Sequence, residues 1–116
     1  MLYNKTKGKK IIEKTRIADS FWKRFKGLMF AKKPDYALIF ELEKEGKINA
    51  SIHMLFVFFP IDIIYLDSNK KVVDIKYNFK PFSLNYTPKK PSKYFIEFLA
   101  GKIKNTISLN DTLEWQ

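Results

Sequence analysis

Four polar side chains that could take part in chemistry lie within or beside apolar segments of this sequence. His53 is the only histidine, and Asp62 interrupts the most apolar stretch, residues 51–67. Glu97 lies inside a second apolar stretch, and Arg24 borders an aromatic segment. A buried carboxylate without a partner is neutralised or very costly. Arg24 is the natural partner, because a guanidinium binds a carboxylate through two hydrogen bonds.

Two interpretations of this group stay open. In one, an ion pair locks a short helix onto a sheet, as buried polar networks often do. In the other, these side chains border a polar pocket between the helix and the central strands. That pocket would suit a carboxylate-bearing or sugar-like small molecule, or a peptide end. Its expected residues are Arg24, His53, Met54, Asp62 and Glu97.

Catalysis is a further hypothesis, centred on His53. This residue could act as the general base of a weak hydrolase, oriented by Asp62 or Glu97. A half-buried histidine bonded to a backbone carbonyl explains the same residue, and no serine stands in a nucleophile-elbow pattern. We therefore favour a non-catalytic binding module over an enzyme.

Composition argues against several other chemistries. The chain has no cysteine and one histidine, too few for the ligand sets of zinc sites. Its 4 glycines are scattered and form no phosphate-binding loop. We expect neither a metal nor a cofactor.

The positive charge is concentrated at the start of the chain. The formal net charge is +10, and residues 1–33 carry 11 basic against 2 acidic side chains. This segment could bind nucleic acid or another acidic partner, or it could be a solvated lysine-rich face. Lysine dominates the basic residues, whereas bidentate recognition of phosphate favours arginine. The candidate surface residues are Lys7, Lys9, Lys10, Lys14, Lys23 and Lys26.

Short apolar segments separated by turn residues predict a mainly β fold. Alternation places Asp62, Ile64 and Leu66 on one face of a strand and Ile61, Ile63 and Tyr65 on the other. Residues 67–71, DSNKK, predict a hairpin turn. We expect one domain over residues 1–116, a compact β-sandwich or barrel of short, mostly antiparallel strands with one short helix near residues 20–28. The predicted strands cover residues 2–4, 10–17, 36–42, 48–56, 61–66, 72–79 and 94–100, and residues 107–115 are expected to form a last strand or a pair of strands.

No signal-peptide pattern opens the sequence, and the apolar run at residues 51–66 is too short for a membrane helix of about 20 residues. We therefore expect a soluble cytoplasmic protein without a membrane partner. The sequence leaves the oligomeric state open.

Three stretches together resemble the domain-of-unknown-function 192 family, also called uncharacterised protein family 0127. They are RFKGLMF at Arg24 to Phe30, HMLFVFFPIDIIYLD at His53 to Asp67, and FIEFLAG at Phe95 to Gly101. The resemblance covers nearly the whole chain and implies a β-sandwich or barrel with one short helix. It implies no established activity.

The chain departs from the family pattern next to Met54. The residue before that methionine is His53 instead of an aromatic one, and Leu55, Phe56 and Val57 replace a common Lys-Asn-Thr. If the polar residues form a site in relatives, this chain has lost or rebuilt it.

Overall fold

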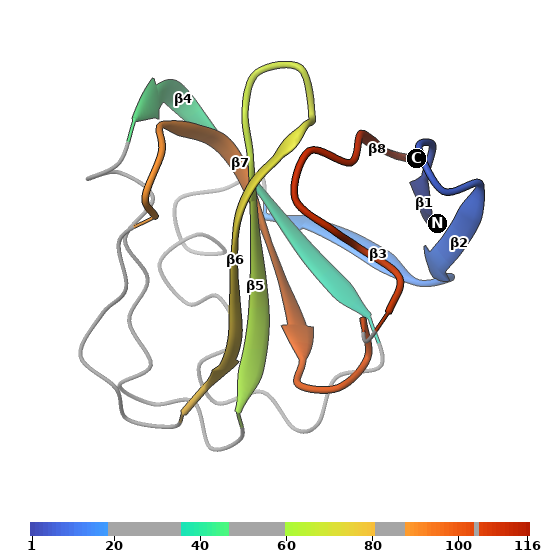
Figure 1. Cartoon of the computed structure of the whole chain (residues 1–116). Helices are drawn as coiled ribbons and strands as arrows, with labels where there is room; N and C mark the ends of the chain where they lie inside the picture. Colours follow the sequence, from blue (N-terminus) through green and yellow to red (C-terminus); the bar gives the residue numbers. More distant parts are fainter. Residues whose placement is uncertain (19–35, 47–59, 81–87, 104) are drawn as a thin grey trace.

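The computed structural model describes residues 1–18, 36–46, 60–80, 88–103 and 105–116 (Figure 1). Every regular element in these ranges is a strand, which confirms the mainly β prediction. The helix expected near residues 20–28 and the strand expected at 48–56 lie outside them. No helix in the described ranges is long and apolar enough to cross a membrane.

A five-stranded sheet forms the larger layer (Figure 1). Its strands pair antiparallel, except that the edge strand β3 runs parallel to β4. In spatial order they are β3 (Thr15–Ala18), β4 (Ala37–Gly46), β7 (Ser92–Leu99), β5 (Ile61–Leu66) and β6 (Val72–Phe79).

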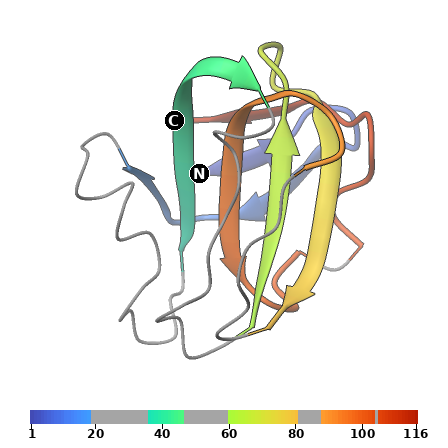
Figure 2. The same cartoon turned by 90° about the vertical axis from the view of Figure 1, so that its left-hand side faces the viewer.

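A three-stranded antiparallel sheet joins the two ends of the chain. Its order is β2 (Lys9–Ile12), β1 (Leu2–Asn4) and β8 (Leu113–Trp115). Viewed from the side, its strands run across those of the larger sheet (Figure 2). Within the described residues the two sheets remain separate and do not close into a barrel, which favours the sandwich alternative over the barrel.

The central hairpin follows directly from local sequence. All six residues of β5 are buried, as expected for a β-branched strand paired on both sides. Asp67 forms the turn that follows, because its Oδ1 accepts hydrogen bonds from the backbone N–H of Asn69 at 2.9 Å and of Lys71 at 3.0 Å. The hairpin predicted at residues 67–71 is confirmed.

The strand predicted over residues 10–17 is wrong, because the chain divides there between the two sheets. β2 ends at Ile12 and belongs to the small sheet, whereas β3 begins at Thr15 and belongs to the large one. Likewise, only Leu113–Trp115 of the last predicted segment forms a regular strand, and an isolated antiparallel bridge between Thr112 and Lys71 precedes it. Local alternation identifies extended backbone but not the sheet that it joins.

The two faces of the large sheet differ in what they carry. One, which we call the Phe98 face, packs against the small sheet and the segment before β8, with Leu2, Ile103 and Leu113 in the same core cluster. The opposite one, the Glu97 face, carries a stacked pair, Phe40 and Phe95, with ring centroids 4.3 Å apart. By register the Phe98 face comprises Ala37, Ile39, Asp62, Ile64, Leu66, Ile96 and Phe98, and the Glu97 face Leu38, Phe40, Ile61, Ile63, Tyr65, Phe95 and Glu97.

Candidate functional site

Asp62 is buried on the Phe98 face, with 3% of its surface exposed. Its Oδ1 accepts a hydrogen bond from the backbone N–H of Asn78 at 2.8 Å, and its Oδ2 accepts one from Gly101 at 3.1 Å. Asn78 lies where the β5–β6 register shifts, and its φ of 51° fits such an irregularity. The carboxylate therefore holds an irregular part of β6 and the turn after β7 against β5.

The contact between Asp62 and Gly101 also joins two of the stretches that carry the family resemblance. Gly101 has a φ of 91°, a conformation that residues with a Cβ rarely adopt. An added Cβ would meet no atom within 4 Å, so the backbone angle, and not crowding, is what requires glycine. These two motif residues have a clear structural role.

Glu97 is also buried, at 5% exposure, but it lies on the opposite face from Asp62. Asp62 pairs with Phe98 in the β5–β7 register, and Ile63 pairs with Glu97. Side chains directly across an antiparallel pair share a face, and successive residues alternate. The sequence expectation that both carboxylates border one pocket therefore does not agree with this register.

Two further polar side chains occupy the Glu97 face. Lys76 pairs with Ile63, so Glu97, Ile63 and Lys76 follow one another in a row across three strands. Tyr65, fully buried, lies in the next row, opposite Phe95. Sequence reasoning did not single out Tyr65 and Lys76. Strand alternation places Tyr65 with Ile63, but only the register brings Lys76 into line with Glu97.

Asp74 occupies the end of that second row, opposite Tyr65. It is 6% exposed, and its two oxygens accept hydrogen bonds from the backbone N–H groups of Ile75 at 2.8 Å and Lys89 at 2.9 Å. These bonds attach residues 88–90 to β6. The carboxylate of Asp74, like that of Asp62, therefore stabilises the fold by accepting backbone hydrogen bonds.

The remaining members of the expected pocket lie outside the residues that the structure describes. These are Arg24, His53 and Met54. The hydrolase hypothesis on His53, and the pairing of Arg24 with a carboxylate, stay predictions. Within the described ranges, no three His, Cys, Asp or Glu side chains come together as a group that could hold a metal ion.

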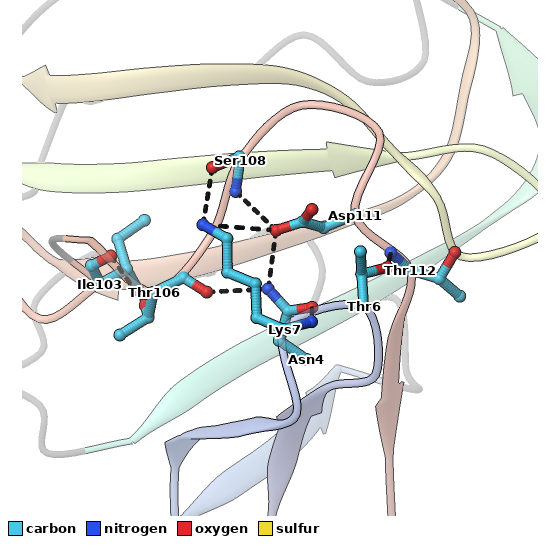
Figure 3. Close-up of polar contacts among 8 residues, drawn as sticks. All are labelled: Asn4, Thr6, Lys7, Ile103, Thr106, Ser108, Asp111 and Thr112. Atoms are coloured by element: carbon cyan, nitrogen blue, oxygen red, sulfur yellow. Dashed lines mark hydrogen bonds and ion pairs between the residues drawn. The ribbon is translucent and has the colours of Figure 1, made fainter.

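A polar network that the sequence did not reveal lies between the β1–β2 hairpin and the segment before β8 (Figure 3). Asn4, fully buried, donates through Nδ2 to the carbonyl oxygen of Thr106 and to Oδ2 of Asp111, both at 2.8 Å. The same Asp111 oxygen accepts the backbone N–H of Ser108 at 2.9 Å and lies 3.6 Å from Nζ of Lys7.

This network controls the ionisation of Asp111. Burial acts to raise the pKa of its carboxyl, but the hydrogen bonds from Asn4 and Ser108, with the charge and hydrogen bond of Lys7, outweigh that effect and lower the pKa. Lys7 is itself held, since its Nζ donates to Oγ of Ser108 at 2.6 Å. Of the expected basic surface, Lys7 therefore serves the fold.

The other basic residues of the expected surface fall into two groups. Lys9, Lys10 and Lys14 are exposed, and Nζ of Lys10 lies 3.1 Å from Glu13. Lys23 and Lys26 fall outside the described ranges.

The geometry defines a class of protein before any comparison: a β domain of two sheets with ionisable side chains held inside it. Sequence comparison then places the chain plainly in a family. It belongs to the DUF192 family, described as Uncharacterized ACR, whose model matches residues 2–115. The resemblance stated from the motifs is confirmed.

Known relatives are similar over nearly the whole chain. The UPF0127 protein of Pyrococcus furiosus is 50% identical, covering 98% of this chain and 97% of that protein. The UPF0127 protein of Thermococcus sibiricus is 45% identical, covering 100% of this chain and 75% of that protein.

Two solved structures share the fold. A protein of unknown function from Novosphingobium aromaticivorans has a TM-score of 0.78 and 24% identity, covering 87% of this chain and 74% of that one. A Sinorhizobium meliloti protein, whose description proposes a transcription regulator, has a TM-score of 0.77 and 25% identity, covering 86% and 79%.

Proposed function

We propose that this protein is a non-catalytic module that binds a small polar molecule on the Glu97 face. The observation that carries the proposal is the row formed by Glu97, Ile63 and Lys76, in which one apolar residue separates a carboxylate from an ammonium group. Their strands are two inter-strand spacings apart, roughly 9–10 Å. Glu97 is 5% exposed and Lys76 is partly exposed, and burying a charge is costly, so the buried carboxylate is unusual for a face that only packs.

The chemistry of the row indicates the class of ligand. Glu97 accepts hydrogen bonds when ionised, and Lys76 donates them, so the two ends suit a molecule with a donor at one end and an acceptor at the other. Tyr65 and Phe95, whose ring centroids are 6.2 Å apart, would contact its apolar body. A free amino acid, a peptide end or a sugar meets these requirements.

Asp62 has a different part in this proposal from the one expected from sequence. Its carboxylate faces the other side of the sheet and accepts two backbone hydrogen bonds. A substitution there is expected to weaken the fold and to leave ligand selectivity unchanged, which makes it a useful control.

A thermal-shift screen of amino acids, dipeptides and monosaccharides tests the proposal. We expect at least one compound to raise the Tm, since a ligand at 100 times its Kd stabilises the native state by about 2.7 kcal/mol. Glu97→Gln and Lys76→Met should each remove that rise.

Two control variants make the result specific. Asp62→Asn should lower the Tm of the free protein yet keep the rise on adding the compound. Glu114→Gln, at an exposed position of β8, should change neither. An undiminished rise in both Glu97→Gln and Lys76→Met would refute the proposal, as would the absence of any rise across the screen.

A further inference from the structure

Two aromatic rings from different sheets meet where the small sheet packs on the large one. Tyr94 lies on β7 and pairs with Leu66 of β5, which places its side chain on the Phe98 face. Trp115 lies on β8 and pairs with Leu2, a member of the core cluster between the sheets. Both rings pack against that cluster and stay partly exposed. Their centroids are 5.2 Å apart and their planes meet at 76°, so they form a corner, which we call the aromatic corner.

An ammonium group of the protein lies in this corner. Nζ of Lys70 lies 4.3 Å from the ring centroid of Trp115 and 5.9 Å from that of Tyr94. Both distances fall within the roughly 6 Å over which the negative face of an aromatic ring attracts a cation. The aromatic corner therefore has the chemistry of a cation site, and a side chain of the protein itself supplies the cation.

The backbone brings Lys70 to the corner from the turn between β5 and β6. Its N–H donates to the carbonyl oxygen of Asp67, and its own carbonyl oxygen accepts the N–H of Leu113, both at 3.0 Å. Its φ of 61° is a conformation that glycine and asparagine adopt more readily than lysine does. Both hydrogen bonds belong to the backbone, so they persist when the side chain swings away from the rings.

The charges around the corner favour a cation. Glu41 pairs with Tyr94 in the β4–β7 register and so lies on the same face. Burial raises the pKa of the Tyr94 hydroxyl, and the negative charge of Glu41 raises it further. Lys93 offsets part of this charge, because its Nζ lies 3.8 Å from Glu41. Glu114 pairs with Tyr3 and therefore faces the other side of β8 from Trp115.

We propose that the aromatic corner binds a small organic cation carrying a trimethylammonium group, and that Lys70 occupies the site when this ligand is absent. A primary ammonium is a compact, strongly hydrated charge, which makes its transfer from water to a ring face costly. A trimethylammonium group presents methyl groups to the rings, and aromatic side chains recognise such cations. Lys70, Tyr94 and Trp115 are each only partly exposed, which favours a compact ligand.

Titration of the unaltered protein with choline chloride, followed by NMR at the indole N–H signal of Trp115, tests this proposal. The signal is assigned by its absence from the spectrum of Trp115→Phe. We expect a saturable shift that an equal concentration of sodium chloride does not produce. Dimethylbutanol, the neutral carbon isostere of choline, should bind several-fold more weakly, because it lacks the charge that the rings attract.

Lys70→Gln is the most informative variant, because it keeps both rings and removes the competing ammonium group. An exposed contact of this kind favours the occupied corner about two- to fivefold, so the Kd for choline should fall about three- to sixfold. Loss of folding cannot produce such a gain in affinity. Tyr94→Leu should weaken binding, whereas Tyr94→Phe, which keeps the ring, should not.

Two matched controls make the result specific. Lys71→Gln removes the same charge from the neighbouring, exposed residue and should lower the Kd much less than Lys70→Gln does. Glu97→Gln should leave the affinity for choline unchanged, because the Glu97 face and its proposed ligand are separate from the aromatic corner.

Three results would overturn the proposal. The first is a Kd that Lys70→Gln leaves unchanged or lowers no more than Lys71→Gln does. The second is equal affinity for choline and dimethylbutanol, which would indicate an apolar patch without selectivity for a cation. The third is binding of a trimethyllysine peptide without binding of choline, which would assign the corner to a protein partner instead of a small molecule.

Discussion

Asp62 and Glu97 lie one register position apart on adjacent strands, and their side chains point to opposite faces of the same sheet. The two carboxylates are close in the backbone but cannot line one cavity. Asp62 is fully engaged by two backbone N–H groups, whereas Glu97 shares its row with Lys76. The two carboxylates, although both lie in apolar strands, therefore have different roles. Asp62 stabilises the fold, whereas Glu97 belongs to the proposed binding face.

Asp62→Asn should destabilise the protein by about 1–3 kcal/mol, because an amide NH₂ would face a backbone donor and leave a buried group unsatisfied. Chemical denaturation measures the loss. Native-state hydrogen exchange should show faster exchange at the amides of Asn78 and Gly101, the two donors to this carboxylate.

Asp74→Asn provides the reciprocal control for that experiment. It should speed exchange at Ile75 and Lys89 and leave Gly101 protected, because its hydrogen bonds lie elsewhere on β6. If both variants accelerate the same amides equally, the carboxylates do not act locally and the structural roles assigned to them are wrong.

The stability should fall with acidification, partly through Asp111. Its folded-state pKa is lowered from 3.8, so its contribution is fully present above that value and is lost as the pH drops through the folded pKa. Denaturation midpoints measured from about pH 5 to pH 2 should decline, and Asp111→Asn should reduce the decline below about pH 4.

Asn4→Ala supplies the comparison for the pH experiment. Removing the Asn4 amide takes away one of the hydrogen bonds that lower the pKa of Asp111. The acid-dependent part of the stability should shrink in this variant too. An acid dependence identical to that of the unaltered protein in both variants would contradict the role given to the network.

Gly101→Ala should cost about 1–2 kcal/mol through its backbone alone, because a residue with a Cβ is strained at positive φ. No neighbouring atom would be crowded by the added methyl group. Asparagine tolerates positive φ better than alanine, so Gly101→Asn should lose less. Denaturation midpoints in the order Gly, Asn, Ala test this reasoning; an alanine variant as stable as the original would show that the turn relaxes freely.

Local sequence was sufficient for several parts of this fold. The extents of β1, β5 and β6, the turn at Asp67 and the alternation of Asp62 with Ile63 all follow from short-range patterns. Each of these features depends on side-chain periodicity or on hydrogen bonds between residues close in the sequence. A few consecutive residues are therefore enough to predict it.

The tertiary structure decided how those pieces relate. Sheet membership separates β2 from β3, although one alternating pattern runs through both. Register decides that Glu97 aligns with Lys76 and not with Asp62. Long-range folding brings Asn4 to Asp111 and ties the ammonium group of Lys7 to Asp111 and Ser108. The alternation of apolar and polar residues predicts which side chains of one strand share a face. The strand with which it pairs, and the register of that pairing, depend on contacts between segments distant in the sequence. A register shift of one residue would move every side chain of the strand to the opposite face.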